Sequence, residues 1–275
     1  MFTRAIVRPP AANFSEGLSE GLGAPDYEKA RQQHEAYCEV LERCGLALER
    51  LPPDPQYPDS TFVEDAAVLA GTIGSQFAIL ARPGAISRRD EVTSIRQALR
   101  HFFPSSAILA IESPGTLDGG DVCEADDHFF IGISERTNED GARQLAKMFE
   151  HFGFTSSLVD IQGTGIAPVT DAQSPHPTME LLHLKSGVAY LGDRRLAITE
   201  ALADREEFRG YDLVVVDRAE DYAANCVKVN DYVLVADGYP QFRSTLQGLG
   251  YQTISLEMSE FQKMDGGLSC LSLRF

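Results

Sequence analysis

Apolar and polar residues alternate along this chain in short runs, and the runs occur in pairs that are separated by a tight turn. Strict alternation is typical of a half-buried strand, and two such runs joined by a turn predict a β-hairpin. The pattern recurs, with copies that begin at Val63, Gly119, Leu182, Ala223 and Gly266. The last copy ends without a second strand, and residues 2–7 at the other end of the chain are its predicted partner.

An amphipathic helix and one more strand follow each hairpin. Asn138 is a suitable N-cap, and Leu145, Met148, Phe149 and Phe152 then recur at the spacing of one helix face. The other predicted helices cover residues 27–45, 88–103, 200–209 and 240–249. The strands expected after the helices cover residues 46–51, 107–111, 157–161, 213–216 and 252–256.

Five copies of strand-strand-helix-strand, with the two chain ends sharing one hairpin, predict a closed ring. We therefore expect an α/β fold, a five-bladed α/β propeller, in one domain that spans residues 1–275. A doubly wound sheet is the alternative, but it alternates strands and helices singly. Residues 162–180 are rich in Gly, Thr, Pro and Ser and predict a long surface loop or a mobile lid.

The net charge and the cysteines limit the kinds of function that the chain is expected to have. A formal net charge of −17 without a basic run disfavours nucleic-acid binding and suits a cationic ligand or simple solubility. Apolar runs are far too short to span a membrane. The five scattered cysteines suggest free thiols in a reducing cytoplasm. No zinc spacing or nucleotide-binding motif is present, so neither a cofactor nor a resident metal is expected.

In a ring of blades, equivalent positions of different repeats become neighbours at the axis. A thiol, an imidazole and several carboxylates gathered there are the components of a nucleophilic active site. Glu64 and Asp65 are adjacent, so on a strand at most one of them would face the axis. The residues at these positions are Glu64, Asp65, Asp118, Asp121, His183, Asn225 and Cys270.

These residues also have structural explanations. A lone cysteine such as Cys270 is often a small buried apolar residue, and His183 between two leucines could be a hydrogen-bonded core histidine. Asp118 and Asp121 flank two glycines, as in an ordinary turn. Composition and spacing alone leave both explanations open.

Seven segments carry a family resemblance. They are DSTFVED (59–65), RPGAISRR (82–89), GTLDGGD (115–121), GISERTN (132–138), LHLKSG (182–187), AANC (223–226) and MDGGLSC (264–270). Together and in this order they resemble the dimethylarginine dimethylaminohydrolases. That family belongs to the pentein, or guanidino-group modifying, superfamily of five-bladed α/β propellers. The resemblance runs from about Leu18 to Phe275.

The resemblance implies cofactor-free hydrolysis of Nω-methylated arginine, a small cationic substrate, to citrulline and a methylamine. It implies that Cys270 attacks the guanidinium carbon and forms a covalent thiouronium, and that His183 protonates the departing amine and then activates water. Asp118 occupies the position of the carboxylate that partners the histidine. No step requires a metal, although Cys270 and His183 could bind inhibitory zinc.

The resemblance also implies the substrate-binding residues. They are Asp59, Glu64 and Asp65 for the guanidinium, Arg88 and Arg136 for the α-carboxylate, Leu18 in a lid-like segment, and Met264 and Asp265. Carboxylates that bind two nitrogens would orient the planar cation, and two arginines suit a carboxylate because their forks bind it bidentately. Without substrate, Asp65 and Asp118 would raise the pKa of the Cys270 thiol. Solvated surface arginines are the structural alternative for Arg88 and Arg136.

Two other functions stay open. One is a deiminase that acts on free arginine or another small guanidino compound. The other is a non-catalytic binding protein with the pentein fold, because fold does not dictate activity. Residues 162–180 are longer than the resemblance leads us to expect and would reshape the entrance or mediate self-association, for example in a homodimer.

Overall fold

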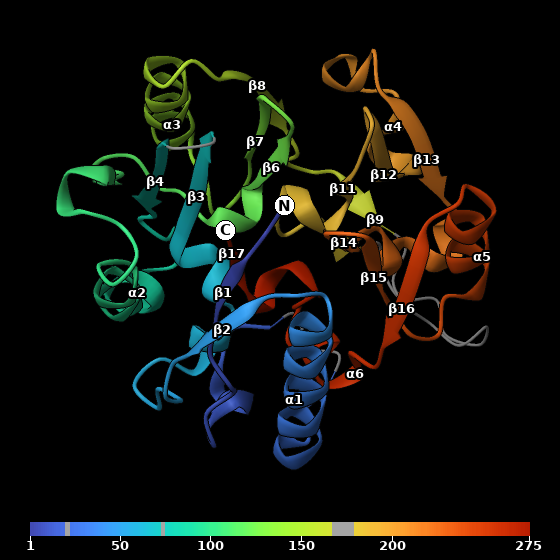
Figure 1. Ribbon diagram of the computed structural model, residues 1–275, viewed down its shortest axis with the longest axis horizontal. Coiled ribbons are helices and arrows are strands. Elements are labelled where there is room, and N and C mark those ends of the chain that lie inside the picture. Colours follow the sequence, from blue (N-terminus) through green and yellow to red (C-terminus); the bar gives the residue numbers. More distant parts are fainter. Residues whose placement is uncertain (20–22, 73–74, 167–178) are drawn as a thin grey trace.

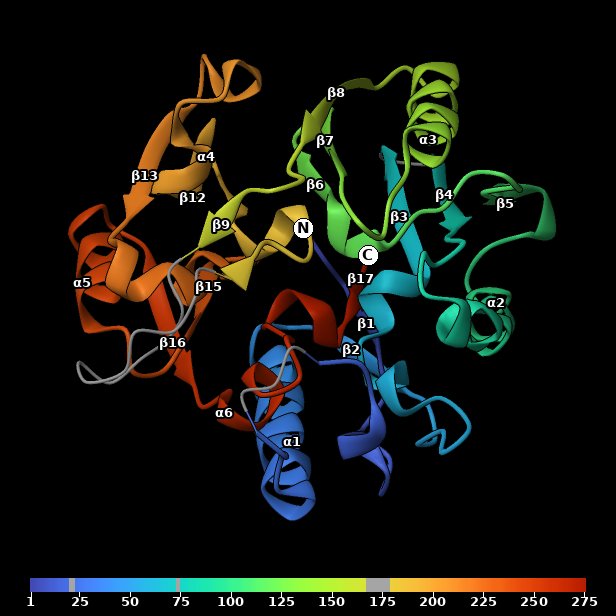
Figure 2. The ribbon, with the colours of Figure 1, turned by 180° about the vertical axis from the view of Figure 1, so that it is seen from behind.

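Five three-stranded sheets are arranged around a central axis in the computed structural model, which describes residues 1–19, 23–72, 75–166 and 179–275. Figure 1 shows the sheets with their helices as sectors of a ring, and Figure 2 shows the same ring from behind. In chain order from the N-terminus, the sheets are β17(Leu273–Arg274)-β1(Arg4–Val7)-β2(Ala47–Arg50), β3(Ala67–Thr72)-β4(Ser75–Leu80)-β5(Ile108–Ala110), β6(Val122–Ala125)-β7(His128–Ile133)-β8(Thr155–Asp160), β11(Val188–Gly192)-β12(Arg195–Thr199)-β13(Asp212–Val216) and β14(Val227–Val229)-β15(Tyr232–Ala236)-β16(Gln252–Leu256).

Each sheet repeats the same topology, an antiparallel pair of strands with a third strand parallel to the middle one. The first sheet joins the two chain ends, because β1 pairs antiparallel with β17 in the register Ala5↔Arg274 and Ile6↔Leu273. The predicted strand-strand-helix-strand repeats and the pairing of the terminal strands are therefore confirmed. Both chain termini lie at the centre of the ring in Figure 1, close to the inner strands.

The helices cover the outside of the ring. They are α1 (Tyr27–Arg43), α2 (Val92–Leu99), α3 (Glu139–His151), α4 (Glu200–Ala203), α5 (Pro240–Gly248) and α6 (Ser259–Gln262). The helix expected over residues 200–209 is shorter than predicted. Arg205 has an extended backbone (φ −65°, ψ 137°) that ends the helix and lets Phe208 pack into the same core cluster as Leu202.

Caps and apolar stripes explain the two longest helices. Asp26 caps α1 by accepting a hydrogen bond from the Lys29 amide at 2.9 Å, and Asn138 caps α3 through the Gly141 amide at 2.8 Å. A side-chain cap of this kind stabilises a helix by about 1 kcal/mol. Phe152 follows α3 and stacks on Phe77 with ring centroids 3.9 Å apart.

Short 3₁₀ turns precede the inner strand of every repeat, where the sequence has a turn of small or acidic residues. They cover Val63–Ala66, Gly119–Asp121, Leu184–Ser186, Arg218–Ala224 and Ser269–Leu271. Neighbouring turns contact one another around the axis. Successive side chains in a 3₁₀ turn point about 120° apart, so adjacent residues of one turn reach different surroundings.

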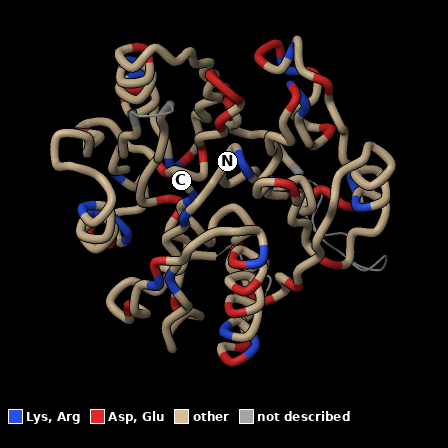
Figure 3. Tube along the Cα trace, viewed as in Figure 1, with Lys and Arg blue, Asp and Glu red and all other residues tan. Residues whose placement is uncertain are grey.

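The inner strands enclose a cavity on the axis, which we call the axial cavity. Its volume is about 550 Å³, and it is lined by residues of β3, β6, β11, β14 and β17. Glu124 and Lys228 are among its charged lining residues. Figure 3 shows that Asp and Glu positions are otherwise spread over the outer elements all around the ring.

The segment 162–180 is only partly described. β9 (Gly165–Ile166) pairs antiparallel with β10 (Met179–Glu180), and most of the predicted loop, residues 167–178, lies outside the described residues. All five cysteines are free thiols and all are buried. Among the described residues, no helix has both the length and the apolar content needed to cross a membrane.

Candidate active site

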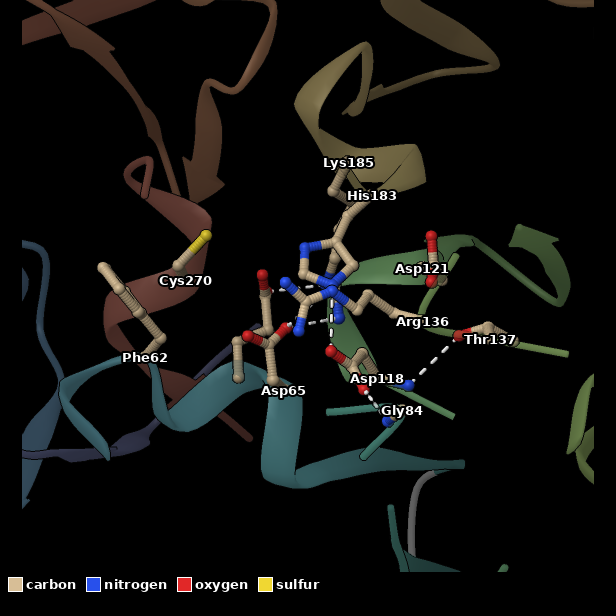
Figure 4. Close-up of polar contacts among 12 residues, drawn as sticks. Phe62, Asp65, Gly84, Asp118, Asp121, Arg136, Thr137, His183, Lys185 and Cys270 are labelled. Atoms are coloured by element: carbon tan, nitrogen blue, oxygen red, sulfur yellow. Dashed lines mark hydrogen bonds and ion pairs between the residues drawn. The ribbon is translucent and has the colours of Figure 1, made fainter. Parts of the chain in front are cut away.

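A narrow polar pocket lies where the 3₁₀ turns meet. Its volume is about 20 Å³. Of the residues to which the resemblance assigns a role, all line it except Asp118 and Glu64, and the further candidates Asp121 and Asn225 also lie outside it. The lining residues are Leu18, Asp59, Phe62, Asp65, Arg88, Arg136, Leu182, His183, Met264, Asp265, Gly266 and Cys270. We call this the polar pocket, and Figure 4 shows how its central side chains converge.

His183 is paired with Asp118 directly behind the pocket. The imidazole Nε2 lies 3.1 Å from Asp118 Oδ2, and Asp118 is fully buried. Burial opposes the charged imidazole, but Asp65 and Asp118 outweigh it and raise the pKa of His183 to about 9. The ring is therefore an imidazolium at neutral pH and can donate a proton.

Asp118 is held in place by a close approach of two loops. Its Oδ1 accepts a hydrogen bond from the Gly84 amide at 2.9 Å. A Cβ at position 84 would lie 2.3 Å from the Arg136 carbonyl oxygen, so only glycine allows this approach. The orientation of His183 thus depends on backbone groups as well as on the carboxylate.

Asp65 is the carboxylate at the centre of the polar pocket. Its Oδ1 accepts a hydrogen bond from the Gly120 amide at 3.0 Å and lies 3.9 Å from His183 Nε2, while its Oδ2 is 2.6 Å from Arg88. Burial would raise its pKa, but His183 and Arg88 outweigh burial and lower the pKa below its usual value. Asp65 is therefore an anion that faces the pocket.

Cys270 lies in the turn Ser269–Leu271, and Figure 4 shows its sulfur on the side that faces the His183 ring. The side chain is 9% exposed, and the Gly267 amide donates to Sγ at 3.4 Å. Burial, Glu64 and Asp65 raise the pKa of the thiol to about 12. The sequence analysis expected this direction but attributed it to Asp65 and Asp118, whereas the structure assigns the second contribution to Glu64. Without a ligand, Cys270 is therefore a neutral thiol.

Arg88 and Asp59 line the pocket with their charges already engaged. Arg88 donates to Asp65 and, at 2.7 Å, to Glu91, while its Nε is buried and has no hydrogen-bond partner among residues 1–19, 23–72, 75–166 and 179–275. Both oxygens of Asp59 accept the Leu18 amide, at 3.0 and 3.2 Å. The structure thus gives Asp59 a contact with the predicted lid segment.

Arg136 differs from Arg88, because its guanidinium makes no ion pair or side-chain hydrogen bond within the described residues. Its backbone amide is held by Ser134 Oγ at 3.0 Å, and Ser134 Oγ donates to Asp121 at 2.7 Å. Asp121 also accepts the Leu184 amide at 2.9 Å. Asp121, which a simple turn could have explained, therefore ties the Arg136 loop to the His183 turn.

Glu64 requires a correction, because its carboxylate is not part of the polar pocket. It lies 2.6 Å from Lys185 Nζ and 3.3 Å from Arg274, and it accepts a hydrogen bond from Ser269 Oγ at 2.6 Å. These groups line the axial cavity. The expected strand is a 3₁₀ turn, which directs Glu64 and Asp65 toward different cavities.

Asp65, Asp118 and His183 also have the spacing of a metal site, with ligand atoms all within 4.8 Å of one another. The hydrogen bonds of both carboxylates to Gly84, Gly120 and Arg88 account for this cluster on protein contacts alone. Cys270, which the sequence analysis paired with His183 as zinc ligands, is not in the cluster.

Some pocket residues were not expected from the sequence. Phe62, Leu182 and Gly266 line the pocket, and Glu91 holds Arg88 from behind. Glu91 follows Arg88 by three residues, a helical spacing at which a charge pair could have been noticed. Apolar residues such as Phe62 and Leu182 carry no such signal.

Comparisons with known proteins were made on the whole chain. The N(G),N(G)-dimethylarginine dimethylaminohydrolase of Pseudomonas aeruginosa is 40% identical over 276 residues, covering 100% of both chains. The protein of the same name from Streptomyces coelicolor is 31% identical and covers 98% of this chain and 96% of its own. No protein-family profile matches the chain.

Solved structures agree with this assignment. A cysteine-to-serine mutant of the Pseudomonas aeruginosa enzyme, complexed with citrulline, superposes with a TM-score of 0.89 at 39% identity over 100% of both chains. The N-terminal domain of ArgZ, an arginine dihydrolase, is 17% identical with a TM-score of 0.79, which shows the shared fold alone. The chain therefore belongs to the N(G),N(G)-dimethylarginine dimethylaminohydrolase family.

Proposed function

We propose that this chain hydrolyses Nω-methylated L-arginine to L-citrulline and methylamine or dimethylamine. The observation that carries the proposal is the polar pocket in which Cys270, His183 and Asp65 meet, with Asp118 bound to the imidazole. A nucleophile, a proton donor and an anion for a planar cation are what attack on a guanidinium requires. Relatives named for this reaction, one of them solved with citrulline, support the same conclusion.

Substrate binding uses the charges that line the pocket. The guanidinium binds against Asp65, which replaces part of its contact with Arg88 by a contact with the substrate. Arg136 receives the substrate α-carboxylate, with Arg88 as the second cation named in the sequence analysis. Because the pocket is only about 20 Å³ and Asp59 holds the Leu18 amide, binding requires the segment that carries Leu18 to move. Met264 and Asp265 complete the wall beside Cys270.

The first chemical step forms the thiouronium. The substrate cation offsets Asp65 and lowers the pKa of the Cys270 thiol, whose proton passes to solvent. The thiolate attacks the guanidinium carbon and gives a neutral tetrahedral adduct. The His183 imidazolium donates its proton to the methylated nitrogen, the C–N bond breaks, and the neutral amine leaves a cationic thiouronium on Cys270.

The second step restores the enzyme. Neutral His183 accepts a proton from water as the water oxygen attacks the thiouronium carbon. The C–S bond then breaks as the hydroxyl proton of the adduct passes to the sulfur, which releases citrulline, restores the Cys270 thiol and leaves His183 as an imidazolium. Asp118 stabilises that imidazolium through the 3.1 Å contact in both steps.

Deimination of free arginine follows the same chemistry, with ammonia as the leaving group. The two functions are distinguished by turnover of arginine, monomethylarginine and asymmetric dimethylarginine side by side, with citrulline as the common product. We expect kcat/KM for at least one methylated substrate to exceed that for arginine by more than about tenfold. Preference for arginine would replace the proposed substrate, and absence of citrulline from all three would favour a binding protein.

A homodimer and a cytoplasmic location stay predictions. Sedimentation of the purified chain tests the first, and fractionation of cells that express it tests the second. Neither enters the chemistry above, because every proposed catalytic group comes from the one chain described here.

A further inference from the structure

Behind the polar pocket, a buried hydrogen-bonded network surrounds the Glu64 carboxylate, which is 4% exposed. Oε1 contacts Lys185 Nζ at 2.6 Å and Arg274 at 3.3 Å, and Oε2 accepts the Ser269 hydroxyl at 2.6 Å. All of its partners come from other repeats or from the last strand. Glu64 is thus the point at which distant parts of the ring are tied together.

Each partner is close in sequence to a residue of the proposed chemistry. Glu64 precedes Asp65, Ser269 precedes Cys270, and Lys185 follows His183 by two residues. The members of these pairs line different cavities, the network on the axial side and the reacting groups in the polar pocket. A shift of one network side chain therefore moves the turn that carries a reacting group.

Asn225 closes the network from a fourth repeat. Its side-chain amide donates to the Lys185 carbonyl at 2.8 Å, and its carbonyl oxygen accepts the Ser269 amide at 2.9 Å. Arg274 also donates to the Ser269 carbonyl at 3.2 Å. Ser269, which precedes Cys270, is consequently held through its side-chain hydroxyl, its backbone amide and its backbone carbonyl.

We propose that Glu64, Lys185 and Ser269 form a positioning unit that holds the Cys270 turn against the His183 turn and sets the charge behind the sulfur. This inference rests on the proposed function and assigns Glu64 a role in orienting the nucleophile, in place of substrate binding. Glu64 places its negative charge on the axial side of Cys270, and Lys185 neutralises it. Removal of the Glu64 charge therefore favours the Cys270 thiolate, whereas removal of the Lys185 charge disfavours it.

Steady-state kinetics separates this role from substrate binding. For Glu64→Gln and Ser269→Ala we expect kcat to fall by at least about tenfold, since a small displacement of the nucleophile is costly in rate. KM should change by less than about twofold, because neither side chain lines the polar pocket. A rise in KM with unchanged kcat would restore Glu64 as a substrate ligand and overturn the proposal.

The pH dependence of Cys270 alkylation by iodoacetamide tests the charge component and needs no turnover. Glu64→Gln should shift the profile to lower pH and Lys185→Met to higher pH, each by about one unit, or about tenfold in rate at fixed pH. The double variant should return close to the wild-type profile. Ser269→Ala changes no charge and should leave the profile in place while kcat falls.

Matched controls come from outside the network. Lys228 lines the same cavity but donates to the Leu191 carbonyl and lies over the Tyr251 ring, and Glu220 is buried but caps α5 through the Gln241 and Phe242 amides. Lys228→Met and Glu220→Gln should leave both the profile and kcat unchanged. Thermal unfolding of every variant confirms that it is folded, and if Glu64→Gln does not fold, Lys185→Met and Ser269→Ala still decide the matter.

Shifts of Glu64→Gln and Lys185→Met in the same direction, or no shift in either, would overturn the proposal. Wild-type enzyme that makes no citrulline would instead refute the proposed function, whereas the alkylation profiles would still report on the network. The two failures are therefore distinguishable.

Discussion

The axial cavity and the polar pocket lie on two sides of the same 3₁₀ turns, but they differ in size and in chemistry. The axial cavity is about 550 Å³, against about 20 Å³ for the polar pocket. Lys185 and Arg274 in the axial cavity are already paired with Glu64. The small pocket contains a thiol, an imidazolium and Arg136, which forms no ion pair with any residue that the structure describes. The polar pocket is therefore identified as the candidate active site by its converging reactive groups, although the axial cavity is larger.

The difference arises within single turns. In the turn Val63–Ala66, Glu64 faces the axial cavity and Asp65 faces the pocket. In the turn Ser269–Leu271, Ser269 faces the axial cavity and Cys270 faces the polar pocket. Sequence neighbours can therefore have unrelated roles, and variants of one cavity serve as controls for the other.

The largest effect is expected from the nucleophile. Cys270→Ser should lower citrulline formation by more than about 10⁴-fold, because a hydroxyl in this pocket is far harder to ionise than a thiol. Cys226 is also buried but lines the axial cavity. Cys226→Ser should keep activity within about twofold in a citrulline assay, and equal losses from both variants would remove the distinction between the cavities.

Asp118→Asn should have the next largest effect. Without the carboxylate, the pKa of His183 falls from about 9, and kcat should drop by about 10²-fold or more. The alkaline limb of the kcat profile should also move to lower pH. Asp126→Asn is the control, because Asp126 pairs with Tyr190 beside the axial cavity. An unchanged alkaline limb in Asp118→Asn would show that His183 is not the proton donor.

The pH dependence of the free energy of unfolding should also reflect the protonation of His183. The folded-state pKa of His183, about 9, lies above the unfolded value of 6.5, so its contribution is complete below pH 6.5 and is lost as the pH rises through 9. Relative to His183→Ala, wild-type protein should lose up to about 3 kcal/mol of unfolding free energy over this interval. Urea unfolding at several pH values measures this, and parallel curves for the two proteins would contradict it.

The smallest effect is expected in the axial cavity. Glu124 is exposed at the axial cavity, where the surrounding walls partly desolvate its carboxyl group and raise its pKa to about 7, and its side chain makes no hydrogen bond or ion pair within the described part of the chain. Glu124→Gln should leave kcat/KM within about twofold from pH 6 to 8. An inflection near pH 7 that disappears in this variant would show that the axial cavity is coupled to the chemistry.

Much of the fold was predictable, because hydrophobic alternation and the N-caps Asp26 and Asn138 are local signals. The sequence pattern also indicated which repeats would bring Cys270 and His183 together. It indicated a turn of small or acidic residues ahead of each hairpin, but it did not predict that this turn is a 3₁₀ turn, because residue type alone does not fix the backbone geometry. The side toward which Glu64 points therefore could not be predicted.

The contacts of charged groups were harder still. Whether Arg88 is solvated or paired depends on Glu91 and Asp65, whose positions are set by the packing of whole repeats. The amide of Gly84 reaches Asp118 across two loops, which no local pattern reveals. Residues in long-range networks require the folded structure.

Labelling by 2-chloroacetamidine, an electrophile shaped like the head of the substrate, tests the assignment of the polar pocket most directly. Its carbon forms a bond to a thiolate with loss of chloride, and intact mass with peptide mapping identifies the site. All five cysteines are buried, so selectivity reports recognition of the amidinium. We predict a single adduct, on Cys270, that is absent in Cys270→Ser and suppressed by citrulline. Labelling of Cys123 or Cys226 in the axial cavity, or equal labelling of several cysteines, would contradict the account.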